Sequence, residues 1–122
     1  MTTFKRFEDI KSWQKAREVT RQIYQISPDE KFFRDYGLRD QIRRSAVSIM
    51  ANIAEGYGRK TNKDFANFLV IAHVSTAETQ SHLYIALDLN YITPEQFTEI
   101  YGKLDEASKM TMAFCTHLLR SS

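Results

Sequence analysis

The chain has 122 residues, of which 43% are hydrophobic and 26% charged, the balance of one ordinary globular domain spanning residues 1–122. Its single cysteine, Cys115, excludes an internal disulfide and a cysteine-based zinc site, and suits a reducing compartment. The formal net charge of +2 permits an anionic partner without requiring one. With only four glycines and two prolines there are few turns, which favours few, long helices.

The chain contains no segment that suggests secretion or membrane insertion. Acidic and basic residues precede any apolar run in the first nine positions, so we expect no signal peptide. The longest stretch without a formal charge, residues 65–77, is too short to span a bilayer. We therefore expect a cytoplasmic protein that makes no membrane contact.

The first half of the chain predicts two long helices. Apolar residues spaced three or four apart indicate a helix over Phe7–Ile26. Ser27–Glu30 has a Ser, a Pro and a Glu in the positions of a capping box, which predicts a short helical turn over Asp29–Phe33. Gly37 marks a weaker break before a second long helix over Leu38–Tyr57.

The second half predicts two more. Gly56 indicates a helix end, and Thr61 a new N-cap before a helix over Lys63–Leu89. Thr93–Gln96 repeats the capping box and opens a helix over Pro94–Arg120. Short loops between long helices favour antiparallel neighbours. The sequence thus predicts an all-α fold, an antiparallel up-down four-helix bundle.

The second predicted helix is apolar on two sides. Besides one stripe that includes Ile42 and Ile49, it carries a second on roughly the opposite side, formed by Val47, Met50, Ala51 and Ala54. A helix that is apolar nearly all round is usually buried nearly all round, and a four-helix bundle cannot enclose it. The second stripe therefore predicts a subunit contact. The alternative is that the alanines are good helix formers on an exposed face.

A stretch of this second helix resembles a known family. The segment Asn52–Gly56, followed by Arg59, resembles the small four-helix-bundle proteins encoded by intervening sequences in bacterial 23S ribosomal RNA genes, relatives of which are accessory proteins of diversity-generating retroelements. The resemblance implies a cytoplasmic bundle, often a ring-shaped homopentamer, with nucleic-acid binding in some members. Two positions depart from the family pattern: Met50 stands where Pro is frequent, and Val74 where Gly is usual.

Polar residues in the same helix are expected to serve structure and assembly. Asn52 borders the first apolar stripe, so its amide is expected to find partners on another helix and fix the register. Glu55 lies four residues before Arg59, a spacing that suits an ion pair if the helix continues past Gly56. The residues predicted to support structure or assembly are Val47, Met50, Asn52, Ala54, Glu55 and Gly56.

No pattern of residues predicts catalysis. Metal sites in helical bundles use Glu-x-x-His pairs, but Glu78 and His82 are four apart and His117 lies alone. His73 sits among apolar residues and is expected to be a hydrogen-bonded bundle residue. Glycine-rich phosphate loops and serine-nucleophile motifs are missing. We expect a non-enzymatic protein with no metal, no cofactor and no small-molecule substrate.

The charge distribution points to an anionic partner. Residues 31–63 contain eight basic and three acidic side chains, a net charge of +5, against −3 for the rest of the chain. Arginine predominates, which favours phosphate recognition. Arg39 and Arg43 share one side of a helix, and Arg44 falls about 100° from Arg43, so Arg44 is the least expected contact of the three. The candidate nucleic-acid contacts are Arg39, Arg43, Arg44, Arg59, Lys60 and Lys63.

Aromatic residues are interleaved with these cations. Phe32, Phe33, Tyr36 and Tyr57 either stack on bases or pack between helices. The leading hypothesis is an oligomeric module, a pentamer as the resemblance implies, that binds structured RNA or DNA. The rival is a protein-binding scaffold without a nucleic-acid role, whose basic residues balance the acids of neighbouring subunits.

Overall fold

The computed structural model describes residues 4–121, and all regular structure in that range is helical. A 3₁₀ turn, η1 (Phe7–Asp9), precedes α1 (Lys11–Ile26), the short α2 (Glu30–Arg34), α3 (Tyr36–Tyr57), α4 (Asn62–Asp88) and α5 (Pro94–Arg120). The prediction of an all-α chain with four long helices is confirmed. None of the helices in this range is both long and apolar enough to cross a membrane.

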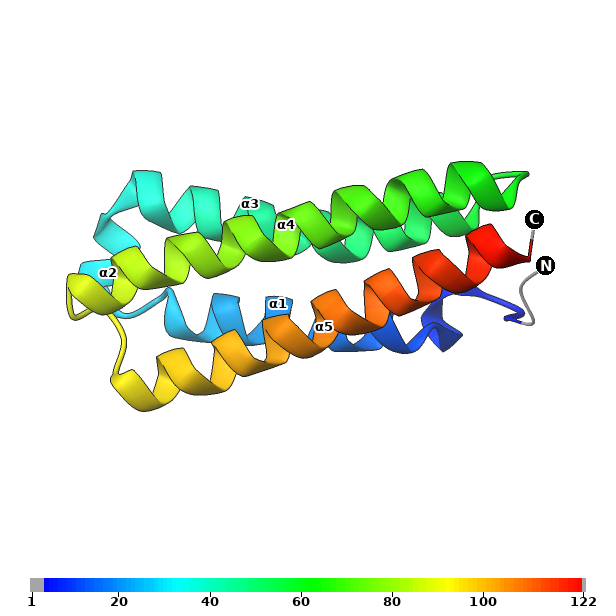
Figure 1. Cartoon of the computed structure of the whole chain (residues 1–122). Helices are drawn as coiled ribbons and strands as arrows, with labels where there is room; N and C mark the ends of the chain where they lie inside the picture. The colour runs from blue at the N-terminus through cyan, green and yellow to red at the C-terminus, as the bar shows by residue number, and fades with distance from the viewer. Residues whose placement is uncertain (1–3, 122) are drawn as a thin grey trace.

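The four long helices lie lengthwise beside one another, in an arrangement consistent with a bundle (Figure 1). Helix α3 packs against α1 and α4, and α5 packs against the same two helices. Polar side chains cross these contacts: Thr79 Oγ1 donates to Ser45 Oγ at 2.8 Å, and Thr20 Oγ1 donates to the carbonyl of Ala46 at 3.2 Å. These hydrogen bonds satisfy buried hydroxyl groups and fix how α1, α3 and α4 sit against one another.

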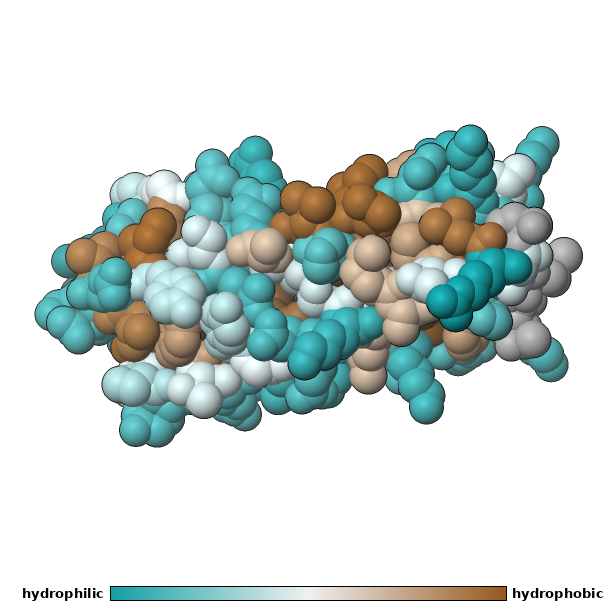
Figure 2. Space-filling model, viewed as in Figure 1, coloured by the Kyte–Doolittle hydropathy of each residue, from teal (hydrophilic) through white to brown (hydrophobic). Residues whose placement is uncertain are grey.

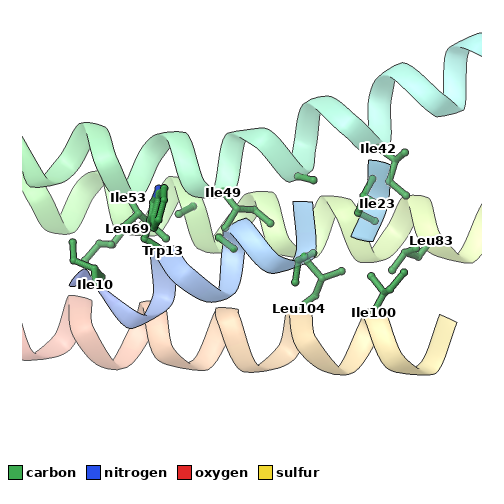
Figure 3. Packing of buried hydrophobic residues seen from close by; sticks show 14 of the residues in the cluster. Ile10, Trp13, Ile23, Ile42, Ile49, Ile53, Leu69, Leu83, Ile100 and Leu104 are labelled. Carbon is green, nitrogen blue, oxygen red and sulfur yellow. The ribbon is translucent and has the colours of Figure 1, made fainter. Parts of the chain in front are cut away.

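The apolar stripes predicted from spacing meet in one core. Ile42, Ile49 and Ile53 of α3 are fully buried, and Figure 3 shows them projecting between the helices toward residues of α1, α4 and α5. Burying a large aliphatic side chain contributes about 1.5–3 kcal/mol relative to leaving it exposed. The other labelled core residues are Ile10, Trp13, Ile23, Leu69, Leu83, Ile100 and Leu104.

Two of the predicted helix starts are confirmed in atomic detail. Thr93 and Gln96 form a reciprocal capping box, with Gln96 N donating to Thr93 Oγ1 at 3.1 Å and Thr93 N donating to Gln96 Oε1 at 2.8 Å. Thr61 caps α4 by accepting from the backbone N–H of Asp64 at 3.1 Å. These caps satisfy backbone donors that a helix start otherwise leaves unpaired.

Three local expectations were wrong. The first helix begins only at Lys11, because Ile10 has an extended backbone. Ser27 does not cap α2: Asp29 occupies the cap position without a side-chain hydrogen bond, and the Ser27 hydroxyl serves another partner. Gly37 lies inside α3, which begins one residue earlier because Asp35 Oδ1 accepts from the N–H of Leu38 at 3.2 Å.

Helix α3 ends at Tyr57 as predicted, with Gly58 at the C-cap, and Gly56 is its second-last residue. Gly56 is buried against Phe65 and Phe68 of α4. A Cβ at this position would lie 2.8 Å from both the Phe65 ring and the Phe68 Cβ, closer than carbon atoms pack. Glycine is therefore required here by the approach of two helices rather than by a turn, in agreement with its predicted structural role.

Candidate nucleic-acid interface

The six predicted cations divide into two groups at opposite ends of α3. Arg39, Arg43 and Arg44 lie in the first half of α3, whereas Arg59 and Lys60 follow its last turn and Lys63 begins α4. Fourteen residues separate Arg43 from the end of α3 at Tyr57, which is roughly 20 Å at 1.5 Å per residue. One chain therefore does not bring the two groups into a single patch.

In the first group, the Arg39 guanidinium contacts a carboxylate, a backbone carbonyl and two aromatic rings. Its guanidinium forms an ion pair with Asp40 at 2.8 Å and donates to the carbonyl of Phe33 at 3.3 Å. The same group lies over the Phe33 ring at 4.5 Å and the Tyr36 ring at 4.9 Å from the ring centroids. Only 17% of the Arg39 side chain is exposed, so much of its charge is already satisfied within the chain.

Arg43 is held next to it by different partners. Its Nε donates to Ser27 Oγ at 2.7 Å, and its guanidinium lies 4.5 Å from the Tyr24 ring and 6.0 Å from the Phe33 ring. Arg39 and Arg43 thus share one side of α3, as expected. The alternating series Tyr24, Arg43, Phe33, Arg39 and Tyr36 is called the arginine–aromatic ladder below.

Arg44 points away from the ladder. Its side chain is exposed, and no ion pair or hydrogen bond involves it anywhere in residues 4–121. The sequence ranked Arg44 as the least expected phosphate contact of the three. The structure instead leaves Arg44 with the most available charge, because Arg39 and Arg43 are already engaged by side chains of α1, α2 and α3.

The second group lies beside the start of α4. Arg59 forms an ion pair with Glu55 at 3.1 Å and stacks over Phe68 at 4.5 Å, so the expected pairing past Gly56 does occur. Lys60 and Lys63 are exposed and have no ion pair among the described residues. Arg59 and Lys60 also line a groove of about 320 Å³, together with Phe4, Tyr57, Thr61, Asn62 and Phe65.

The electrostatics of this groove favour anions. It opens beside the N-terminus of α4, a 27-residue helix whose first turn presents backbone N–H groups. The positive end of a helix dipole adds to the charges of the nearby cations over the first turn. Within the second group, Arg59 is stacked on Phe68 and paired with Glu55, so Lys60 and Lys63 carry its uncompensated charge.

The aromatic residues interleaved with the cations differ in how deeply they are buried. Phe32 is fully buried and stacks on Tyr91 at 5.3 Å, and Tyr57 is half-buried with its hydroxyl donating to the carbonyl of Phe4 at 2.8 Å. These two pack inside the fold, whereas Phe33 and Tyr36 remain exposed. Sequence reasoning missed Tyr24, which lies on α1 and belongs to the ladder only because α1 and α3 are neighbours.

The second apolar stripe of α3 separates into two parts. Val47 and Ala51 face outward, with Val47 40% exposed, while Met50 and Ala54 are half-buried against the core. Helix α4 adds the exposed apolar side chains of Val70, Ile71 and Val74, of which the sequence singled out only Val74, as a departure from the family pattern. Figure 2 shows apolar atoms gathered over the middle of α4. Together, Val47, Ala51, Val70, Ile71 and Val74 form the outer apolar face.

Asn52 finds its partners on its own helix. Its amide donates to the carbonyl of Ser48 at 2.8 Å and to Ser48 Oγ at 3.0 Å, so the expected partner on another helix was wrong. Ser48 Oγ in turn lies 2.9 Å from Ser75 Oγ of α4. The amide therefore connects α3 to α4 through one hydroxyl rather than directly.

Titratable groups elsewhere pack as structural residues. His73 Nδ1 lies 2.6 Å from Ser108 Oγ, as expected for a hydrogen-bonded bundle histidine. Cys115 is buried, and this burial raises the pKa of its thiol. Across residues 4–121, no group of three or more His, Cys, Asp or Glu side chains is placed to hold a metal ion.

The fold and surface define a class of protein, an all-helical chain of four long helices with cationic groups at both ends of α3. The chain belongs to the 23S rRNA-intervening sequence protein family, whose model matches residues 8–113. A similar solved structure is a protein of unknown function from the S23 ribosomal protein family of Bacteroides thetaiotaomicron. It is 30% identical, covers 85% of this chain and 97% of its own, and superposes with a TM-score of 0.78. A comparison with curated proteins finds no match.

Proposed function

We propose that this protein is an antiparallel up-down four-helix bundle that works without catalysis, self-associates, and binds structured RNA or other nucleic acid in the cytoplasm. The observation that carries the nucleic-acid role is the set of exposed, uncommitted cations at the two ends of α3, Arg44, Lys60 and Lys63. They belong to a segment whose net charge is +5. Each cation that neutralises a phosphate releases a counterion, which drives binding without sequence specificity.

Self-association supports this role. In the outer apolar face, Val47, Ile71 and Val74 are 40%, 46% and 58% exposed, and large exposed apolar side chains on neighbouring helices favour a contact with another copy. A ring of copies, with five as the number implied by the family resemblance, repeats both cationic groups around one axis. This repetition brings cations of neighbouring copies into one field, which a single chain does not achieve.

The assembly is tested by light scattering coupled to size exclusion. We expect a single species whose mass is a multiple of 14.3 kDa. Val74→Glu is expected to lower this mass, because burying an unpaired carboxylate in a subunit contact is unfavourable. Thr116→Glu, at an exposed position on α5, is the matched control and leaves the mass unchanged. A wild-type protein that is monomeric at micromolar concentration contradicts this part of the proposal.

The nucleic-acid role is tested by purification without nuclease. We expect nucleic acid to co-purify at low salt, to be detected by absorbance and identified by sequencing, and to be removed by high salt. The triple variant with Arg44, Lys60 and Lys63 changed to Ala is expected to purify without it. Wild-type protein free of nucleic acid at low salt, with no uptake of added RNA, opposes the proposal.

The second candidate function is a protein-binding scaffold with no nucleic-acid role. The observation that favours it is the ion pair of Arg39 with Asp40 within the chain, which neutralises one of the six predicted cations before any phosphate binds. Under this hypothesis the remaining cations pair with carboxylates of neighbouring copies. Changing Arg44, Lys60 and Lys63 to Ala then weakens assembly, whereas the leading proposal predicts unchanged assembly and lost nucleic-acid binding.

A further inference from the structure

The arginine–aromatic ladder gathers five side chains from three helices onto one surface. Tyr24 comes from α1, Phe33 from α2, and Tyr36, Arg39 and Arg43 from α3. The distances from guanidinium carbons to ring centroids are 4.5, 6.0, 4.5 and 4.9 Å in order along the series. All four lie within the roughly 6 Å over which a cation is attracted to an aromatic face. The result is a series in which guanidinium groups and aromatic rings alternate, each arginine lying over the rings on either side of it.

Both arginines of the ladder are held by polar partners within the chain. Ser27, which accepts the Arg43 Nε–H at 2.7 Å, is itself fully buried. Asp40 and the Phe33 carbonyl fix the Arg39 guanidinium at the other position. Two long side chains that normally lose rotamer freedom on binding have therefore lost it on folding, which lowers the entropy that a ligand must overcome.

The ladder remains accessible at both of its ends. Tyr36 is 61% exposed and Tyr24 is 43% exposed, and these two rings terminate the series, each with an arginine on one side. A further planar group can therefore stack on either tyrosine. Phe33, in the middle, is 42% exposed and lies between the two arginines.

We propose that the ladder is a stacking site for unpaired bases, and that it gives this protein a preference for single-stranded over double-stranded nucleic acid. The inference rests on the proposed nucleic-acid function and adds the class of strand to it. An unpaired base has a free face that can stack on an aromatic ring, and this contact is independent of sequence. Bases inside a duplex are already stacked on their neighbours, and proteins contact A-form RNA mainly through phosphates and 2′-hydroxyls.

Charge at the ladder is compatible with a backbone that follows the stacked bases. Arg43 has no carboxylate partner in the described part of the chain, so its positive charge is not neutralised there. Lys31 of α2 is exposed and also lacks an ion pair within residues 4–121. A single strand bends easily enough to place bases on the rings and phosphates near these cations.

The test compares two probes on the whole protein at one salt concentration. The first is a fluorescein-labelled oligouridylate of about 12 nucleotides, within the site size of single-strand-binding domains. The second is an RNA duplex of the same length. We expect the single strand to bind more tightly, and Tyr36→Leu and Tyr24→Leu each to weaken it by at least about fivefold, the low end of one lost base–aromatic stack. Both variants should leave duplex binding within about twofold, because phosphate contacts alone carry it.

Conservative variants separate stacking from a structural role of the ladder. Tyr36→Phe keeps the ring and is expected to bind the single strand like the wild type, whereas Tyr36→Leu keeps only apolar bulk. Fluorescence of a 2-aminopurine base in the single strand should fall on binding to wild type and to Tyr36→Phe, but less on binding to Tyr36→Leu. Circular dichroism checks that helix content is equal among all variants.

The outcomes distinguish the inference from the function on which it rests. Equal binding of both probes, or single-strand affinity that is unchanged in both leucine variants, overturns the stacking site and leaves the nucleic-acid function standing. A uniform loss for both probes shows a ladder that only clamps α1, α2 and α3 together, and also overturns the stacking site. No binding of either probe at low salt overturns both proposals.

Discussion

The two ends of α3 each carry three of the predicted cations, but they hold them in different ways. At the first end, Arg39 and Arg43 lie over aromatic rings and are held by polar partners, and Asp40 neutralises the charge of Arg39. At the second end, Lys60 and Lys63 extend into solvent beside the start of α4. The comparison teaches that one run of basic residues can place two arginines among aromatic rings at one end of a helix and leave two lysines exposed at the other.

The largest expected effect is on the free energy of unfolding, for glycine-to-alanine changes at the two ends of α3. Gly56→Ala places a Cβ 2.8 Å from the Phe65 ring and the Phe68 Cβ, and we expect it to lower the free energy of unfolding by about 1–3 kcal/mol. Gly37→Ala is the matched change at the other end, where the nearest atom lies 4.0 Å away, and it should be neutral or slightly stabilising. Urea denaturation measures both. Equal effects of the two changes contradict the close approach of α3 to α4 at Gly56.

The next prediction compares the loss of stability when each of two adjacent arginines is changed to Met. Arg43→Met removes the donor to buried Ser27 and the cation over the Tyr24 ring, which should cost about 1–3 kcal/mol of stability. Arg44→Met removes an exposed side chain and should change stability by less than about 0.5 kcal/mol. Thermal unfolding of the two variants at one protein concentration gives the difference. A larger loss for Arg44→Met is incompatible with the ladder as described.

The smallest effect concerns a hydrogen bond at the ladder end. Tyr91 Oη donates to Asp35 Oδ2 at 2.9 Å, and this bond raises the pKa of Tyr91 above its ordinary value of 10.0. A raised phenol pKa stabilises the fold at pH values below 10.0 and loses that contribution as the pH rises through the folded-state pKa. Tyr91→Phe should therefore melt slightly below the wild type near neutral pH. The gap should close above pH 10.0, and a gap independent of pH contradicts the role of this bond.

Much of the fold could be predicted because its signals are local. The apolar spacing of three and four residues located the long helices, and Thr61 and Thr93 marked two starts correctly. The error at Gly37 has a local cause, because Asp35 caps α3 before the glycine, whereas the error at Ser27 comes from a distant partner. Ser27 is read as a cap from its neighbours, but Arg43, sixteen residues later, takes its hydroxyl.

The candidate site was less predictable for the same reason. The charge of residues 31–63 was visible in the sequence, but which cations are engaged depends on side chains brought in by α1 and α2. Tyr24 gave no signal, because an exposed tyrosine on the polar side of an amphipathic helix is ordinary. The contribution of Val70 and Val74 to the outer apolar face was equally hidden, since it becomes apparent only where α4 lies beside α3.

The central claim is that the exposed cations at the two ends of α3 bind nucleic acid. Fluorescence anisotropy with a structured RNA at several salt concentrations tests this claim most directly. We expect affinity to fall steeply with salt, and Arg44→Ala, Lys60→Ala and Lys63→Ala each to shallow the log–log slope by about one unit. Arg39→Ala should change the slope by much less, because Asp40 already neutralises that charge. Wild-type protein that binds no RNA even at low salt, or slopes that are unchanged in all three variants of the exposed cations, would contradict the claim.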